Sequence, residues 1–265
     1  MWRDPFHVQI VEEEDVLYVT SSWKGKLAVL QPFCAPARYP EATQKLLAYF
    51  EEVGQPFHIY DMERDYADFL RSCSCAEFEV VADRDNYDYV YLSEKLISLS
   101  GRKLHSKKNH LNAFRKEHPD AVYQPITDEI VTQCKLELNS WYKQHKQEDG
   151  TVDPFINYER TAILEVLNNF ADFRLQGGAI LLNGRVIAFT FGEQLNKDTA
   201  VIHVEKADPE VRGAYPAINQ GFVEHAWGHL TYINREEDMG IEGLRKAKES
   251  YKPEKLIEKF NATLK

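Results

Sequence analysis

The chain has 265 residues, of which 43% are hydrophobic and 12% aromatic, enough to build one large or two small packed domains. Its 42 acidic residues outnumber its 32 basic ones, and the net charge of -10 argues against a protein that binds duplex DNA. No apolar run approaches the roughly 20 residues that span a bilayer, and residues 1–15 lack the apolar core of a signal peptide. We therefore expect a cytoplasmic protein without a transmembrane segment.

The first half of the chain alternates strand patterns with helix patterns. Apolar residues at helical spacing predict helices at 39–53 and 63–72, and Lys24-Gly25 predicts a turn between two strands. Runs rich in β-branched and aromatic residues predict strands at 8–14, 16–22, 26–32, 57–62, 76–82 and 87–92. This order predicts a mixed α+β sheet.

Residues 101–118 predict a basic amphipathic helix. Leu104, Leu111 and Phe114 fall on one stripe, and the cations lie outside it: Arg102, Lys103, Lys107, Lys108, Arg115 and Lys116. Such a face is most often simply solvated. In an acidic chain it also suits a partner that carries phosphates, and the candidate contacts are then Arg102, Lys107 and Lys108.

The second half predicts the order β-α-α-β-β-β-α-β-α-β. Residues 147–154 predict a loop, and Asn183-Gly184 predicts a hairpin turn because both residues accept positive φ. The first half repeats part of this order without its opening strand and two helices, which suggests an internal duplication with a truncated first copy. Strands are expected at 121–127, 173–184, 185–195, 199–207, 231–234 and 256–262, and helices at 128–146, 157–170, 214–229 and 240–251.

The cysteines match no zinc-binding pattern: Cys34, Cys73, Cys75 and Cys134. With one residue between them, Cys73 and Cys75 are not expected to form a disulfide with each other. His105 and His110 are five residues apart and the motif HExxH does not occur, so no metal site is expected. The thiols are therefore expected to be reduced and structural.

The order of the second half resembles that of the GNAT acyltransferase superfamily. Residues 205–222, EKADPEVRGAYPAINQGF, resemble its acyl-donor loop, where a glycine turn opens a helix whose free N–H groups bind a pyrophosphate. Glu210 and Tyr215 depart from the usual pattern, because a carboxylate repels a pyrophosphate and a tyrosine crowds it. The candidate donor-binding residues of this loop are Arg212, Gly213, Ala214, Tyr215 and Asn219.

A closer resemblance is to a bacterial family named after the C-terminal domain of phosphatidylglycerol lysyltransferase. It rests on residues 101–119, 213–222 and 232–253. The resemblance implies two GNAT-like mixed-sheet domains in tandem, with an incomplete N-terminal domain at 1–100, a basic linking helix at 101–120 and a C-terminal domain at 121–265. It also implies transfer of an aminoacyl group from aminoacyl-tRNA to an amine or hydroxyl of a lipid, peptide or small molecule.

Residues 232–253 carry the candidate catalytic groups. If the chain stays extended beyond the strand at 231–234, Asn234, Glu236 and Asp238 lie on one side. Glu236 is then the candidate base, and Asn234 and Tyr251 complete the catalytic set. Alternatively, Asp238 caps the next helix while Arg235 pairs with a carboxylate.

Two further interpretations stay open on the flanking helices. Arg245 and Lys248 either hold a negatively charged donor group or are solvated cations near a helix C-terminus. Asn219 falls on an apolar helix face, so its amide either ties the helix to a strand end or faces a ligand.

Three functions follow from these readings. The first is an aminoacyl-tRNA-dependent acyltransferase, for which the sequence identifies no cofactor other than the donor substrate. The second is an N-acetyltransferase that uses acyl-coenzyme A. The third is a non-catalytic module that binds a phosphate-bearing ligand or RNA.

Overall fold

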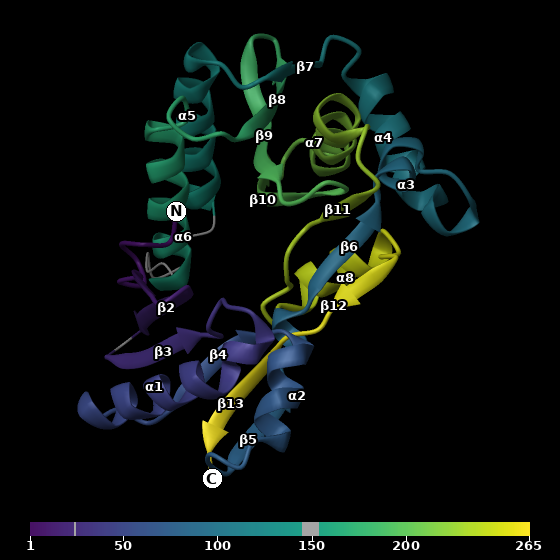
Figure 1. Ribbon diagram of the computed structural model, residues 1–265. Helices are drawn as coiled ribbons and strands as arrows, with labels where there is room; N and C mark the ends of the chain where they lie inside the picture. Colours follow the sequence, from purple (N-terminus) through teal and green to yellow (C-terminus); the bar gives the residue numbers. More distant parts are fainter. Residues whose placement is uncertain (24, 145–153) are drawn as a thin grey trace. The chain divides into compact units, whose positions relative to one another are not determined.

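The computed structural model describes residues 1–23, 25–144 and 154–265 (Figure 1). Lys24 of the predicted turn and residues 147–153 of the predicted loop lie outside this part of the chain. Within it, no helix has both the length and the hydropathy that crossing a membrane requires.

The chain forms two compact units, each with its own sheet. The smaller unit contains Trp2–Tyr87 and Ile257–Lys265, and the larger unit contains Met1 and Asp88–Leu256. These bounds differ from the predicted ranges at both ends, because residues 88–100 fold with the second half and residues 257–265 fold with the first. The predicted linking helix is part of the larger unit.

The smaller unit is a six-stranded mixed sheet in the order β1-β2-β3-β4-β13-β5. β3 and β4 are parallel, and β13 lies antiparallel between β4 and β5. Its strands are β1 (Gln9–Glu13), β2 (Val16–Trp23), β3 (Lys26–Leu30), β4 (His58–Met62), β5 (Phe78–Ala82) and β13 (Phe260–Leu264). Its helices are η1 (Pro36–Arg38), α1 (Tyr39–Glu52), α2 (Arg64–Ser72) and η2 (Arg84–Asn86).

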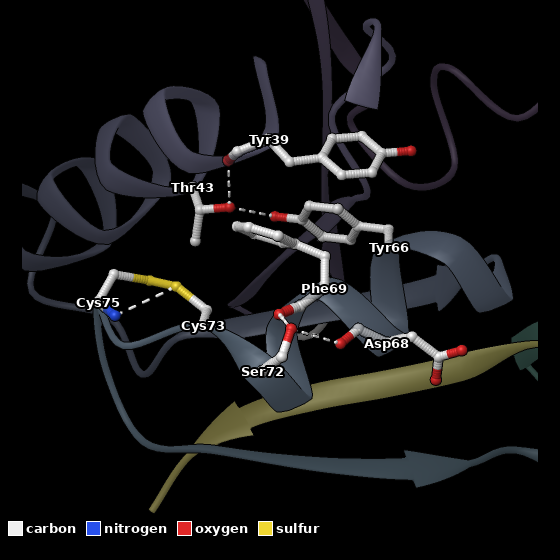
Figure 2. Close-up of a disulfide and its surroundings, with 8 residues drawn as sticks. All are labelled: Tyr39, Thr43, Tyr66, Asp68, Phe69, Ser72, Cys73 and Cys75. Atoms are coloured by element: carbon white, nitrogen blue, oxygen red, sulfur yellow. Dashed lines mark hydrogen bonds between the residues drawn. A yellow bond between two sulfur atoms is a disulfide. The ribbon is translucent and has the colours of Figure 1, made fainter. Parts of the chain in front are cut away.

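The helices α1 and α2 bury their apolar faces in one core with the sheet, including Leu46 and Leu70. A buried hydrogen bond joins them, with 2.8 Å between Thr43 Oγ1 and the Tyr66 hydroxyl, and Thr43 also donates to the Tyr39 carbonyl (Figure 2). The two helices are therefore fixed to each other by a polar contact as well as by packing.

The prediction of free thiols is wrong for Cys73 and Cys75, which form a disulfide (Figure 2). Cys73 follows the last turn of α2 in an extended conformation, and the two Cα atoms are 5.5 Å apart, within the range that a disulfide bridges. The end of a helix thus supplies a geometry that sequence spacing alone does not reveal. Cys34 and Cys134 are free thiols.

The larger unit is a seven-stranded mixed sheet in the order β12-β6-β11-β10-β9-β8-β7. The predicted hairpin is confirmed, since Asn183 and Gly184 both have positive φ between β8 and β9. The strands are β6 (Asp88–Leu92), β7 (Val122–Pro125), β8 (Gln176–Leu182), β9 (Arg185–Gln194), β10 (Thr199–Ala207), β11 (Tyr232–Asn234) and β12 (Lys255–Ile257).

Helices cover both faces of this sheet (Figure 1). One apolar cluster joins α5 and α6 to the strands, and another joins α3, α4 and α7 to them. The helices are α3 (Ser93–Ser98), η3 (Arg102–Leu104), α4 (His105–Glu117), α5 (Asp128–Gln144), α6 (Pro154–Asn168), α7 (Ala214–Phe222), the π-helical turn η4 (Val223–Trp227) and α8 (Glu242–Ser250). The stripe of Leu104, Leu111 and Phe114 is buried, as the sequence predicted.

The two halves of the chain exchange strands. β6 follows the first half in sequence but pairs with β11 in the larger unit, and β13 ends the second half but pairs with β4 and β5 in the smaller unit. The single strand predicted at 256–262 is therefore two strands in different sheets. The order of strands and helices in the two units supports the predicted repeat and the predicted α+β class with two mixed sheets. Truncation of the first copy stays a prediction.

Candidate functional site

The parallel strands β10 and β11 part from each other after three paired residues. Thr199–Val201 pair with Tyr232–Asn234, and β10 then continues to Ala207. The chain after β11 stays with β6 instead, because Arg235 N–H donates to the Tyr89 carbonyl and Tyr89 N–H donates to the Glu236 carbonyl, at 2.9 and 3.1 Å. We call the point of separation the splay, and a group of charged side chains, among them Glu205 and Arg235, lies there.

Arg235 and Glu205 form an ion pair at the splay. Arg235 Nε lies 3.0 Å from Glu205 Oε2, and Nη2 of Arg235 donates to the same oxygen. The other oxygen of Glu205 accepts from Asn219 Nδ2 at 2.8 Å. Both charged side chains are only 13% exposed. Burial opposes the charge of Arg235, but Glu205 together with Tyr91 and Tyr251 outweighs burial and raises the pKa of the guanidinium.

Two aromatic rings face the Arg235 guanidinium. Its central carbon lies 4.9 Å from the ring centre of Tyr251 and 5.6 Å from that of Tyr91. Lys107 Nζ of α4 lies 4.5 Å from the same Tyr251 ring. Burial and the nearby Arg235 lower the pKa of Lys107. Tyr251 therefore contacts two cations, and one residue of the basic helix lies at the splay.

His203 bridges two carboxylates beside this pair. The register between β10 and β9 shifts at His203, which marks an irregularity in the strand. Its Nδ1 is 2.7 Å from Glu236 Oε1 and its Nε2 is 3.2 Å from Glu193 Oε1. Burial opposes protonation, but Glu236 and Glu193 together raise the pKa of the imidazole. The predicted base, Glu236, is thus hydrogen-bonded to a histidine that the sequence did not single out.

Lys248 of α8 is buried against the chain that leaves β11. Its Nζ donates to the carbonyl oxygens of Arg235 and Glu236, the latter at 3.1 Å. Burial first, and then the charge of Arg235, lower the pKa of Lys248 to about 8. Lys248 therefore fixes the backbone of the two residues that carry the charged groups, and it does not lie among the solvated cations of the helix.

The segment after β11 is not extended, so the predicted alternation of Asn234, Glu236 and Asp238 is wrong. Glu236 has a φ of 55°, and Asn234 Oδ1 accepts from the Glu236 N–H at 2.7 Å, which turns the chain. Asn234 Nδ2 donates to Asp88 at 3.0 Å. Asn234 therefore shapes the turn by hydrogen bonds to the Glu236 backbone and to Asp88 of β6.

Asp238 anchors the next turn. Its carboxylate accepts from the Tyr89 hydroxyl at 2.6 Å, from Arg245 at 2.8 and 2.9 Å, and from the Gly240 N–H at 2.9 Å. Burial would raise its pKa, but these donors hold the pKa of Asp238 well below its ordinary value. Asp238 thus pairs with Arg245 of α8 from the turn that precedes this helix, and Arg235 pairs with Glu205, close to the alternative that the sequence left open.

The predicted donor loop begins α7. Arg212 is exposed, Ala214 is buried, and Gly213 has a φ of 88°. A Cβ at Gly213 would lie 2.8 Å from Phe114 Cβ and 3.0 Å from the His110 carbonyl, so close packing against α4 requires this glycine. Packing against α4 is therefore sufficient to explain the glycine at position 213.

Tyr215 lies next to α5. Its hydroxyl accepts a hydrogen bond from Trp141 Nε1 at 3.2 Å, and its side chain is 40% exposed. Tyr215 thus contacts Trp141 of α5 and the backbone of Ala207 at the end of β10, whereas Asn219 contacts Glu205 at the splay. Lys108 and Arg102 are exposed on α4 and η3.

The structure joins some of the predicted site residues through residues that the sequence did not select. Glu205, Arg235, His203 and Tyr91 connect Asn219 of α7 to Tyr251, Lys248 and Glu236. The sequence feature that could have indicated these residues is the presence of two polar residues, His203 and Glu205, in the otherwise apolar strand pattern VIHVEKA. Among the described residues, no group of three or more His, Cys, Asp or Glu side chains is placed to hold a metal ion.

The chain has relatives of known structure. A conserved protein of unknown function from Bacteroides thetaiotaomicron is 35% identical, with a TM-score of 0.87, over 100% of this chain and 88% of that one. The C-terminal domain of a putative lysylphosphatidylglycerol synthetase from Agrobacterium fabrum is 13% identical, with a TM-score of 0.70, over 97% of this chain and 83% of that one. A tandem GNAT protein from the clavulanic acid biosynthesis pathway shares the fold at a TM-score of 0.51 and 8% identity, over 96% of this chain and 81% of that one.

A sequence relative is an uncharacterised protein of Mycoplasmoides gallisepticum. It is 27% identical over 177 residues, which are 65% of this chain and 54% of that protein, so the match spans about half of the relative's length. The family model for the C-terminal region of phosphatidylglycerol lysyltransferase matches residues 1–263. The chain therefore belongs to the phosphatidylglycerol lysyltransferase C-terminal family.

Proposed function

We propose that this chain is an acyltransferase that moves an aminoacyl group from aminoacyl-tRNA to an amine or hydroxyl acceptor. The family and the GNAT-like fold support an acyltransferase. The observation that carries the proposal is the His203–Glu236 hydrogen bond of 2.7 Å beside the Arg235–Glu205 pair. A histidine oriented by a carboxylate is a general base, and a neighbouring guanidinium favours negative charge.

The proposed reaction has one proton to move. The acceptor nitrogen or oxygen forms a bond to the ester carbonyl carbon of the aminoacyl group while His203 takes the proton of the nucleophile. The ester C–O bond then breaks, and the proton passes to the ribose oxygen that leaves. Glu236 orients the imidazole through its hydrogen bond with Nδ1. Nε2 then faces the nucleophile when the side chain of Glu193, which is 50% exposed, moves away from it.

The cations have two roles in this proposal. Arg235 and Lys107 lie together on Tyr251 at the splay and stabilise the oxyanion that forms at the carbonyl carbon. Arg102 and Lys108 are exposed and contact phosphates of the tRNA, with the Arg212–Tyr215 turn as a further donor contact. Lys248 keeps the Arg235–Glu236 backbone in place.

The proposal is tested with the full chain and tRNA charged with radiolabelled amino acids. Transfer of label to an amine or lipid acceptor is expected, and His203→Ala and Glu236→Gln are expected to slow it about 100-fold or more. His229→Ala, which changes an exposed histidine of the same unit, is the matched control. Turnover of acetyl-coenzyme A without use of charged tRNA would replace this function by N-acetyl transfer, and RNA binding without any turnover would leave a non-catalytic module.

A further inference from the structure

A surface cavity lies between α5 and the start of β9, lined by side chains that the proposed reaction does not use. Its volume is about 160 Å³. The polar lining comes from Gln133, Glu137, Ser140 and Arg185, and the apolar lining from Leu136 and Val186.

Glu137 is the unusual residue of this cavity. It is 5% exposed, its carboxylate meets solvent only through the cavity, and it makes no hydrogen bond or ion pair with any residue in the described part of the chain. Buried carboxylates are rare without a partner, because the desolvation of the charge is not offset. Its position on α5, next to the buried Leu138, explains how a carboxylate comes to lie at this depth.

The one cation among the residues that line the cavity, Arg185, is paired with another acid. Arg185 Nη2 donates to Asp208 Oδ2 at 2.7 Å, and Asp208 is 7% exposed. Gln133 is also engaged, since its Oε1 accepts from the Val186 N–H at 3.1 Å. With Glu137 and Asp208 ionised and Arg185 protonated, these three groups carry one uncompensated negative charge.

We propose that this cavity binds a small monocation, a primary ammonium compound, whose nitrogen donates to the Glu137 carboxylate. The Ser140 hydroxyl offers a second acceptor, and Leu136 and Val186 cover a short hydrocarbon chain. A single lining carboxylate does not supply the several oxygen ligands that a divalent cation requires. The site does not rest on the proposed aminoacyl transfer.

The ionisation of Glu137 gives the site a pH dependence. Burial first, and then the charge of Asp208, raise the pKa of Glu137 to about 7, against an opposing effect of Arg185. An ammonium ion binds the ionised carboxylate, so the fraction of protein competent to bind rises from about 0.1 at pH 6 to about 0.9 at pH 8. The apparent affinity for a primary ammonium ion is therefore expected to rise about tenfold between these pH values.

The test uses n-butylammonium chloride as the probe and 1-butanol as the uncharged control, with the full chain at pH 6 and pH 8. Chemical-shift changes of residues around the cavity measure the binding. Binding of n-butylammonium, absence of binding by 1-butanol and the tenfold rise with pH are the expected results. The Glu137→Gln variant is expected to bind n-butylammonium at least tenfold more weakly than the unsubstituted chain. The Glu129→Gln variant, changed at the exposed start of the same helix, is expected to bind with unchanged affinity.

Thermal unfolding of both variants establishes that they fold. If Glu137→Gln does not, the δ-carboxyl resonance of Glu137 in the unsubstituted chain, followed during the titration with n-butylammonium, provides the second readout. Equal binding of the ammonium ion by the Glu137→Gln variant, an affinity independent of pH, or no binding at 100 times the protein concentration would each overturn the proposal.

Discussion

Arg235, which follows β11, forms an ion pair with Glu205 of β10. Each of the two side chains is 13% exposed. The two strands are paired only up to Val201 and Asn234, so this contact spans the point where the sheet opens. An ion pair in place of apolar packing at this point leaves the splay lined by charge.

Removing the carboxylate of this pair is expected to destabilise the protein strongly. Glu205→Ala leaves the Arg235 guanidinium buried without its counter-ion and Asn219 Nδ2 without its acceptor. We expect a loss of about 3–5 kcal/mol in the free energy of unfolding, measured by urea denaturation. Lys246→Ala breaks the exposed pair with Glu242 and is the control, with little change expected. A loss as small as that of the control would mean that the pair contributes no net stability.

Asp238 is expected to make stability depend on pH in the acid range. Its folded-state pKa is held below the ordinary value by Arg245, Tyr89 and the Gly240 N–H. A depressed carboxyl pKa contributes stability that is present above the unfolded pKa of about 3.9 and is lost as pH falls toward the folded value. Asp238→Asn is therefore expected to cost about 2–3 kcal/mol at pH 7, and the difference from the unsubstituted chain should shrink below about pH 4.

Urea denaturation at a series of pH values from 7 to 2 measures this difference. Asp120→Asn, which changes an exposed carboxylate after α4, provides the comparison and should show no such pH dependence. A constant difference between Asp238→Asn and the unsubstituted chain at every pH would show that the carboxylate charge is not the source of the stability.

The two adjacent lysines of α4 are expected to behave differently toward tRNA. Lys108 is exposed, whereas Lys107 is half-buried against the Tyr251 ring. If Lys108 contacts a phosphate, Lys108→Ala lowers the slope of log affinity against log salt concentration by up to about 0.7–0.9. Lys107→Ala is expected to reduce aminoacyl transfer with a smaller change in slope.

Salt titrations of tRNA binding, followed by fluorescence anisotropy, distinguish these effects. Lys197→Ala changes an exposed lysine between β9 and β10 and controls for net charge. An identical slope for Lys108→Ala and the unsubstituted chain would remove α4 from the tRNA-binding surface.

The last strand is expected to stabilise the first half of the chain. β13 pairs with both β4 and β5, and Phe260 of β13 is buried in the core of the smaller unit. Deletion of residues 258–265 should therefore remove amide protection from β4 and β5 in hydrogen exchange, while β8 and β9 keep theirs. Phe260→Ala is expected to cost about 3–5 kcal/mol, and Leu264→Ala, 44% exposed on the same strand, much less. Unchanged protection of β4 and β5 after the deletion would contradict the strand pairing.

The sequence by itself determined the local elements. Periodic apolar residues located helices such as α4, and the Asn183-Gly184 pair located the β8–β9 turn, because both patterns depend on neighbours a few residues apart. The order of these elements, with the family resemblance, also predicted the tandem GNAT-like fold. Among the site residues, Asn234, Glu236 and Asn219 were selected from residues next to the end of a strand or on a helix face.

The tertiary structure alone decided which strands pair and which side chains meet. β6 and β13 have ordinary strand sequences, and their partners in the other half of the chain are set by contacts far apart in sequence. His203 reaches Glu236, and Glu205 reaches Arg235, only because the chain after β11 remains with β6. Glu137 likewise has no ion pair because Arg185 pairs with Asp208 instead. The periodicity of the sequence does not indicate which of these carboxylates Arg185 contacts.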